Sequence, residues 1–256
     1  MDCGLNGRTY IVTGASGGLG LATAKVLAAD GADLVIASRD QERIAAAAEQ
    51  LPTGANVRAV AADLADPQTP ARLIAVAEES FGRLDGAVVS VGGPPAGKLG
   101  DTTEEQWRAA FDSVFLGGLR MARAVLDEPF EPEAQMAVTM VLSSSVKSPI
   151  PGLAISNGLR PGLAMAAKTL ADEYGPRGGR VNVLLPGRID TDRVRSLDAG
   201  SGDAEATRAK NEGAIPLGRY GTPEEFGRVA AFVTSPAASY LSGIAIPVDG
   251  GFLRAL

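Results

Sequence analysis

Three glycines, Gly14, Gly18 and Gly20, have the spacing of a phosphate-binding turn. They follow the short apolar run Tyr10–Val12, and the residues after them are typical of a helix. Glycine lets the backbone turn tightly and approach a pyrophosphate closely, and the N–H groups at a helix start attract negative charge. An ordinary glycine turn could have the same residues, but a strand, a turn and a helix in this order favour a dinucleotide site.

The elements that must position such a site alternate between strands and helices. Seven apolar runs with little polar alternation predict a parallel sheet that helices cover on both faces. The predicted strands are Tyr10–Val12, Leu34–Ala37, Val57–Ala61, Ala87–Val91, Val138–Leu142, Val181–Leu185 and Ile244–Val248. The predicted helices include Gln41–Leu51, Pro70–Phe81, Glu104–Leu126 and Leu163–Tyr174. We therefore expect a doubly wound α/β fold of seven mostly parallel strands in one domain, residues 1–256.

Composition and charge favour small molecules as partners. The net charge is −6 and no block of lysine and arginine stands out, which argues against a nucleic-acid groove or an anionic membrane surface. Cys3 is the only cysteine, so an internal disulfide is impossible and a reducing compartment is expected. No basic segment followed by an apolar run opens the chain, and no stretch reaches membrane-spanning length. We expect a cytoplasmic enzyme, and we predict no metal site.

Residues 190–213 are the one long exception to the strand and helix pattern. Their polar part, Ser196–Gly213, follows a strand end, where open α/β sheets place their ligand crevice. We predict a mobile substrate lid here, and a plain surface excursion is the alternative.

Several motifs together resemble those of the short-chain dehydrogenase/reductase family, over nearly the whole chain. They are Thr13-Gly14-x-x-x-Gly18-x-Gly20, Asp63-Leu64 at the family's adenine contact, Pro186-Gly187-x-Ile189-x-Thr191 at its nicotinamide-side loop, and the C-terminal Val248-Asp249-Gly250-Gly251. The resemblance implies a Rossmann-type fold that binds a nicotinamide dinucleotide. The cofactor-binding residues it implies are Thr13, Gly14, Ser16, Gly18, Leu19, Gly20, Ser38, Arg39, Asp63, Leu64, Gly92, Pro186, Gly187, Ile189 and Thr191.

Two shorter segments, 215–219 and 222–225, resemble the branch of this family that reduces 3-oxoacyl thioesters. The resemblance also implies a homo-oligomer, because members usually form dimers or tetramers through two long helices, here 104–126 and the helix containing 163–174. We expect a homotetramer or a dimer.

The end of the second strand, Ala37-Ser38-Arg39, favours NADP(H) over NAD(H). Ser38 stands where NAD-selective relatives carry an acid, and the planar fork of Arg39 suits a 2′-phosphate. The alternative is that Arg39 is solvated and paired with Asp40 or Glu42.

The resemblance also locates the chemistry. In the family, a hydride passes between C4 of the nicotinamide and a carbonyl carbon. A tyrosine, its pKa lowered by a lysine four residues later, exchanges the proton, and a serine and an asparagine assist. Ser143 aligns with the assisting serine, Ser156 with the tyrosine, Arg160 with the lysine and Val114 with the asparagine. The family's Asn-Asn-Ala-Gly loop reads Ser90-Val91-Gly92-Gly93. The predicted catalytic residues are therefore Ser143, Ser156 and Arg160.

These replacements change what the site can do. A serine hydroxyl can bind a substrate oxygen but is a far weaker acid than a phenol, so Ser156 is a poor proton donor. Arg160 remains charged, so it can stabilise an alkoxide, hold ribose hydroxyls or clamp a carboxylate, but not act as general acid. Pro161 disfavours helical geometry at Arg160, so a helix starts near this point or kinks.

Few other residues could supply the proton. The chain has no histidine, and Tyr10, Tyr174, Tyr220 and Tyr240 map away from the expected nicotinamide. Lys147, in a loop expected to overhang the site, is one hypothesis, with a solvated loop lysine as its alternative. Water relayed by the two predicted catalytic serines is the other.

Three functions remain open at this point. The first is an NADP(H)-dependent oxidoreductase that acts on a ketone or secondary alcohol through an unusual proton path. The second is a cofactor-binding protein without redox turnover. The third is a non-redox isomerase, lyase or cyclase that uses Arg160 and the serines to hold an anionic intermediate.

Overall fold

The computed structural model describes residues 2–129, 135–200 and 202–255. Its sheet has seven strands in the order β3-β2-β1-β4-β5-β6-β7, and every neighbouring pair is parallel. The strands are β1 Thr9–Thr13, β2 Asp33–Ser38, β3 Val57–Ala61, β4 Gly86–Ser90, β5 Ala137–Val141, β6 Arg180–Pro186 and β7 Ala245–Val248. Each predicted strand is present with its ends within one residue of those expected. The doubly wound α/β fold is confirmed.

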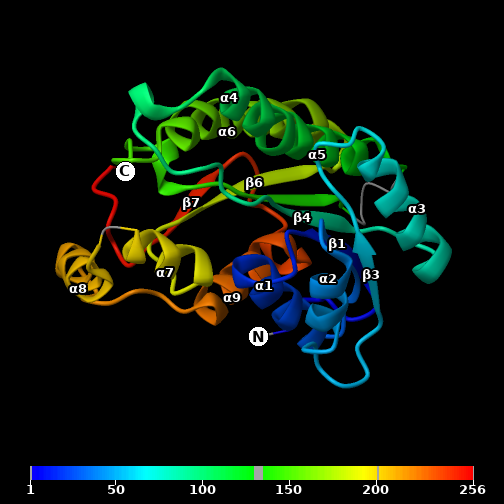
Figure 1. The fold of residues 1–256 in the computed structure, drawn as a ribbon. Coiled ribbons are helices and arrows are strands. Elements are labelled where there is room, and N and C mark those ends of the chain that lie inside the picture. The colour runs from blue at the N-terminus through cyan, green and yellow to red at the C-terminus, as the bar shows by residue number, and fades with distance from the viewer. Residues whose placement is uncertain (1, 130–134, 201, 256) are drawn as a thin grey trace.

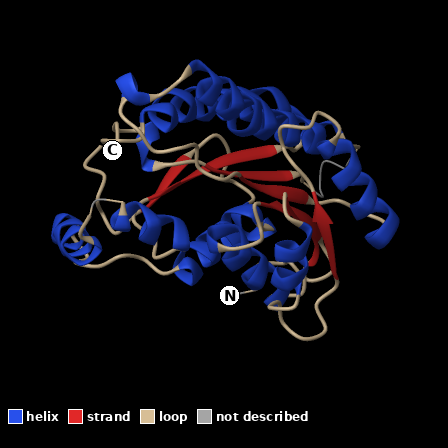
Figure 2. Ribbon diagram, viewed as in Figure 1, coloured by secondary structure: helices blue, strands red, loops and turns tan. Residues whose placement is uncertain are grey.

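Helices cover both faces of the sheet (Figures 1 and 2). The α-helices are α1 Gly18–Ala29, α2 Gln41–Ala48, α3 Thr69–Phe81, α4 Glu104–Ala110, α5 Gly117–Asp127, α6 Ala154–Tyr174, α7 Asp192–Ala199, α8 Ala204–Ala214 and α9 Pro223–Thr234. Short 3₁₀ turns are η1 Leu99–Asp101, η3 Ser144–Val146, η4 Gly175–Arg177 and η5 Pro236–Ala238. No helix in the described part of the chain has both the length and the apolar character needed to cross a bilayer.

Each face of the sheet has its own apolar core, because alternate residues of each strand point to opposite faces. Ile11 and Val35 pack with α3, α5 and α6, whereas Val12 and Leu34 pack with α1, α2 and α9. Every residue of β1, β4 and β5 is buried, which explains why these strands lack polar alternation in the sequence.

The predicted helix Glu104–Leu126 is not one continuous α-helix. A π-helical segment, η2 Phe111–Leu116, separates α4 from α5. Within it, the hydroxyl of Ser113 donates to the carbonyl of Ala109 at 2.7 Å, a contact that competes with the regular backbone ladder. Beyond it, α5 lies so close to the end of β3 that a Cβ on Gly117 would be 2.5 Å from the Leu64 carbonyl oxygen. The wider turn lets α4 and α5 pack independently.

Helix α6 starts earlier than Pro161 suggests. It begins at Ala154 and continues through Pro161, so Ser156 and Arg160 lie one turn apart on the same helix. The Asn157 side chain holds this first turn in place, since it accepts from the Ile150 N–H at 3.0 Å and donates to the Ile150 carbonyl at 2.9 Å. Tertiary packing therefore overrides the local preference of the residue before proline.

The predicted lid, residues 190–213, contains helices α7 and α8, apart from Ser201, which lies outside the described residues. Thr191 accepts from the Val194 N–H to cap α7, and Asp203 accepts from the Ala206 N–H to cap α8. Figure 1 shows α7 near the end of β6 and α8 farther out on the same side of the sheet. A segment that reads as polar loop is thus largely helical.

Candidate functional site

One large cleft, about 1350 Å³ in volume, opens where the parallel strands end. Parallel α/β sheets place their ligands at this edge, outside the carboxyl ends of the strands. Every cofactor-binding and catalytic residue predicted from the sequence lines the cleft. Ordinary ligand pockets measure roughly 300–1,000 Å³, so this volume has room for a dinucleotide and a second small molecule.

The glycine turn forms the floor of the cleft. The Thr13 hydroxyl donates to the Ser90 carbonyl at 2.8 Å and accepts from the Ser90 N–H at 3.0 Å, which joins the ends of β1 and β4. Gly14 has a φ of +61°, and a Cβ there would lie 2.6 Å from the Ser90 carbonyl oxygen. A Cβ on Gly20 would lie 2.4 Å from the Gly14 carbonyl oxygen. Only glycine fits these two positions.

The start of α1 is open to an anion. Its N-cap residue, Gly17, has no side-chain oxygen to accept from the first N–H groups of the helix. Gly17, Gly18 and Leu19 all line the cleft, so this end of the helix faces the open space. The turn therefore fits the pyrophosphate of a dinucleotide by charge and by shape.

At the other end of this half, Arg39 and Arg43 line the cleft beside the ends of β2 and β3. The Asp40 carboxylate accepts from the Arg43 N–H at 2.9 Å and caps α2. Among the described residues, no ion pair joins Arg39 to Asp40 or Glu42. The guanidinium of Arg39 is exposed at the cleft wall.

The predicted catalytic serines belong to a cluster of three. The Ser143 hydroxyl accepts from the Ser145 N–H at 3.1 Å, just after β5. The hydroxyls of Ser145 and Ser156 lie 3.3 Å apart, where either can donate to the other. Ser156 is buried, so its hydroxyl contacts Ser145 rather than bulk water. Sequence reasoning missed Ser145, although the run of three serines after the fifth strand was a visible signal.

Arg160 is a buried cation, 5% exposed. Its Nη1 donates to the carbonyl of Val141, the last residue of β5, at 3.1 Å. Burial, together with the nearby charge of Arg193, lowers the pKa of Arg160 to about 10. The group remains protonated at neutral pH, because its pKa is still well above 7.

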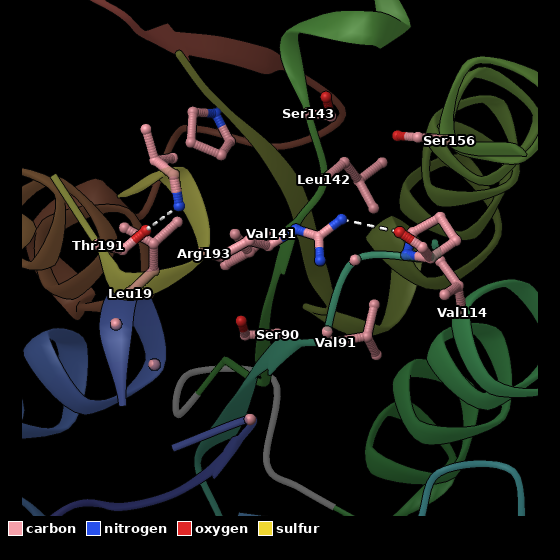
Figure 3. Close-up of a pocket in the computed structure, with 18 of the residues that line it drawn as sticks. Leu19, Ser90, Val91, Val114, Val141, Leu142, Ser143, Ser156, Thr191 and Arg193 are labelled. Carbon is pink, nitrogen blue, oxygen red and sulfur yellow. Dashed lines mark hydrogen bonds between the residues drawn. The ribbon is translucent and has the colours of Figure 1, made fainter. Parts of the chain in front are cut away.

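Arg193, on α7, was not predicted and reaches into the same cleft. Its Nη2 donates to the Pro94 carbonyl at 2.8 Å, in the chain that follows β4 (Figure 3). The side chain passes directly over Gly93, where a Cβ would lie 2.3 Å from the guanidinium carbon. Figure 3 shows this guanidinium extending across the middle of the cleft. Residue 193 therefore connects the predicted lid with the predicted active site.

Similarity to proteins of known class assigns the chain to a family. A family sequence model described as enoyl-(acyl carrier protein) reductase matches residues 14–253. Dehydrogenase/reductase SDR family member 4 of Homo sapiens is 33% identical over 249 residues, which cover 96% of this chain and 88% of the relative. The chain belongs to the short-chain dehydrogenase/reductase family. It is an oxidoreductase of that family.

Two solved structures of short-chain dehydrogenase/reductases are similar over almost their full length. L-sorbose reductase from Gluconobacter frateurii, in complex with NADPH and L-sorbose, has a TM-score of 0.93 at 29% identity and covers 100% of both chains. A short chain oxidoreductase from Pseudomonas aeruginosa PAO1 that contains an atypical catalytic center has a TM-score of 0.88 at 28% identity. The second match covers 97% of this chain and 98% of the other.

In this short-chain dehydrogenase/reductase, none of the four tyrosines lines the cleft. Tyr10 is buried in β1, Tyr174 donates to Asp127, and Tyr220 donates to Asp198 at 2.9 Å. Tyr240 is fully exposed. No phenol therefore reaches the serine cluster, as the sequence suggested.

Lys147 does not overhang the cleft. Its side chain is exposed and is not part of the lining. The hypothesis that Lys147 supplies the proton is not supported by this position. Val114, from the π-helical segment, does line the cleft and contributes an apolar wall with Val91.

Proposed function

We propose that this chain is an NADP(H)-dependent oxidoreductase of the short-chain dehydrogenase/reductase type that acts on a ketone or secondary alcohol. One observation carries the proposal. A glycine turn shaped for a pyrophosphate and the exposed cation Arg39 line the same cleft as Ser143 and Ser156, and Ser145 contacts both serines from behind the cleft surface. The similar L-sorbose reductase, which was solved with NADPH, supports the choice of cofactor.

The residues that would hold the cofactor follow from the cleft. The glycine turn and the start of α1 would bind the pyrophosphate, and Asp63 and Leu64 would lie at the adenine. Arg39, with Arg43 beside it, would pair with the 2′-phosphate, since neither has a carboxylate partner in the described chain. A reduced nicotinamide held by these residues would supply the hydride that the carbonyl carbon accepts.

The chain's own residues would manage the oxygen of the reacting carbonyl. Ser156 can donate to this oxygen, while Ser145 and water renew its proton through the 3.3 Å contact. Arg160, held at the end of β5, would place a positive charge on the same side of the cleft as this oxygen. This is an atypical active site, in which hydroxyls and a guanidinium replace a phenol and an amine.

The α7–α8 segment would serve as a mobile lid over the substrate, because Arg193, Val194 and Leu197 of α7 line the cleft. We also propose a cytoplasmic homo-oligomer, a dimer or a tetramer. Its subunits would meet through the helices α4, α5 and α6, where the exposed Phe111 stacks on Phe115 with ring centroids 5.1 Å apart. Light scattering on the purified chain measures the subunit number.

A second candidate is cofactor binding without redox turnover, which the absence of a phenol from the described cleft favours. Titration of NADPH fluorescence and absorbance at 340 nm with 3-oxoacyl thioesters and diketones separate the two. We expect NADPH binding and slow oxidation in the wild type. A Ser156→Tyr/Arg160→Lys double variant is the matched comparison. Tight NADPH binding with turnover in this variant alone would contradict the proposed oxidoreductase and favour the second candidate.

A further inference from the structure

Two guanidinium groups share the substrate side of the cleft without an acidic partner. Arg160 is 5% exposed and makes one hydrogen bond in the described chain, to the Val141 carbonyl. A guanidinium has five N–H donors, so most of those on Arg160 have no protein acceptor there. One hydrogen bond to a neutral carbonyl does not offset the burial of a full positive charge.

Arg193 is in a similar position, because the acids next to it are already engaged. Asp190 accepts from Arg195 at 2.8 Å and from Arg208 at 3.2 Å, and Asp192 accepts from Arg195 at 3.2 Å. Arg193 itself donates to the Pro94 carbonyl, and no carboxylate in the described chain pairs with it. Two acids thus pair with Arg195, the other arginine of α7, and neither pairs with Arg193, which enters the cleft.

The two charges repel each other across the cleft, and an anion between them would relieve this repulsion. Both side chains line the same cleft, and the charge of Arg193 contributes to the lowered pKa of Arg160. Planar guanidinium forks match the two oxygens of a carboxylate, so each arginine can donate two parallel hydrogen bonds. Arg160 extends from the helix that carries Ser156, so a bound anion would lie near the hydroxyls that face the reacting oxygen.

We propose that the substrate is an oxo acid or hydroxy acid whose carboxylate is held between Arg160 and Arg193. This inference rests on the proposed oxidoreductase function and adds the class of substrate. Arg193 acts as the specificity-determining residue, since it reaches the cleft from α7 and is exposed, whereas Arg160 is buried. Gly93 helps to position Arg193, because any side chain at residue 93 would displace the Arg193 guanidinium.

Calorimetric titration of the chain saturated with NADP⁺ tests this without turnover. The probes are 3-oxobutanoate and its methyl ester, which differ mainly in the negative charge. We expect the acid to bind about tenfold or more tightly than the ester in the wild type. Arg193→Gln should weaken binding of the acid by about tenfold to hundredfold and leave the ester unchanged.

Arg195→Gln is the matched control. It removes the same charge from the same helix, but Arg195 lies outside the cleft lining and pairs with Asp190 and Asp192. The Kd of NADPH, measured by fluorescence in each variant, shows whether Arg193 binds the substrate carboxylate or the cofactor diphosphate. Equal binding of acid and ester, no binding of the acid, or a matching loss of NADPH affinity in Arg193→Gln would each overturn the proposal. The last result would assign Arg193 to the cofactor diphosphate. Normal acid binding with no change at 340 nm would instead contradict the proposed oxidoreductase function alone.

Discussion

The two halves of the cleft encode their functions in different ways. In the cofactor half, between β1 and β3, the decisive features are backbone features: positive φ at Gly14 and uncapped N–H groups at the start of α1. In the substrate half, the decisive features are side chains that meet from distant segments, such as Arg193 and Pro94. Cofactor recognition and reaction chemistry can therefore change separately within this fold.

The largest effect is expected from a substitution in the cofactor half of the cleft. Gly14→Val places a branched side chain at a positive φ and against the Ser90 carbonyl oxygen, 2.6 Å from the Cβ position. We expect NADPH affinity to fall by about a hundredfold or more, with a loss of stability of about 2–4 kcal/mol. Fluorescence titration and urea unfolding measure the two quantities.

Gly213→Ala is the control for this prediction. Gly213 has no positive φ, and a Cβ there would meet no atom within 4 Å, so we expect both quantities to stay near the wild-type values. Wild-type NADPH affinity in Gly14→Val would show that the turn does not hold the cofactor.

A second substitution in the same half should have a smaller effect, on the preference for NADPH over NADH. Arg39→Glu replaces an exposed cation at the end of β2 with an anion, which should repel a 2′-phosphate and accept from a ribose 2′-OH. We expect the ratio of NADPH to NADH affinity to fall by about tenfold to hundredfold. Arg228→Glu, an exposed change outside the cleft lining, should leave the ratio unchanged. An unchanged ratio in Arg39→Glu would remove the argument for NADP(H).

The smallest effect concerns stability in the substrate half. Arg160 keeps its charge while buried and without an acidic partner in the described chain, so Arg160→Met should raise the free energy of unfolding by about 1–2 kcal/mol near pH 7. We expect this gain together with reduced turnover, since the proposed function gives this charge a role in the reaction.

The pH dependence gives the sign of this effect. The folded-state pKa of Arg160 is lowered to about 10, below that of the unfolded chain. As the pH rises through about 10, the folded state releases the proton first, so the unfolded state binds more protons and the wild type becomes relatively more stable. The advantage of Arg160→Met should therefore shrink between about pH 9 and pH 11 in urea unfolding. The Arg195→Met control removes an exposed charge, so its difference in unfolding free energy from the wild type should stay constant over this range. A constant difference for Arg160→Met would contradict a charged and buried Arg160.

The sequence predicts the sheet, and the residues it proposes for the cofactor line one cleft, because apolar runs and glycine spacing are local signals. Three features of the substrate half are not local. The break at η2 depends on close packing of Gly117 against Leu64, and the continuation of α6 through Pro161 depends on tertiary support. The position of Arg193 depends on Pro94, 99 residues away, so no periodicity or motif could have revealed it. Lys147 failed as a candidate for the same reason, since loop direction is set by the surrounding fold.

The π-helical segment Phe111–Leu116 adds one residue to the helix that contains it. A π turn closes its hydrogen bonds over five residues instead of four, so it acts as a one-residue insertion in a helix. One residue rotates the following helix by about 100° about its axis. The insertion therefore sets the phase of α5, whose Met121 and Val125 face the core, apart from the phase of α4. Because Val114 of this segment lines the cleft, the substrate wall lies at the point where the helix can gain or lose a residue.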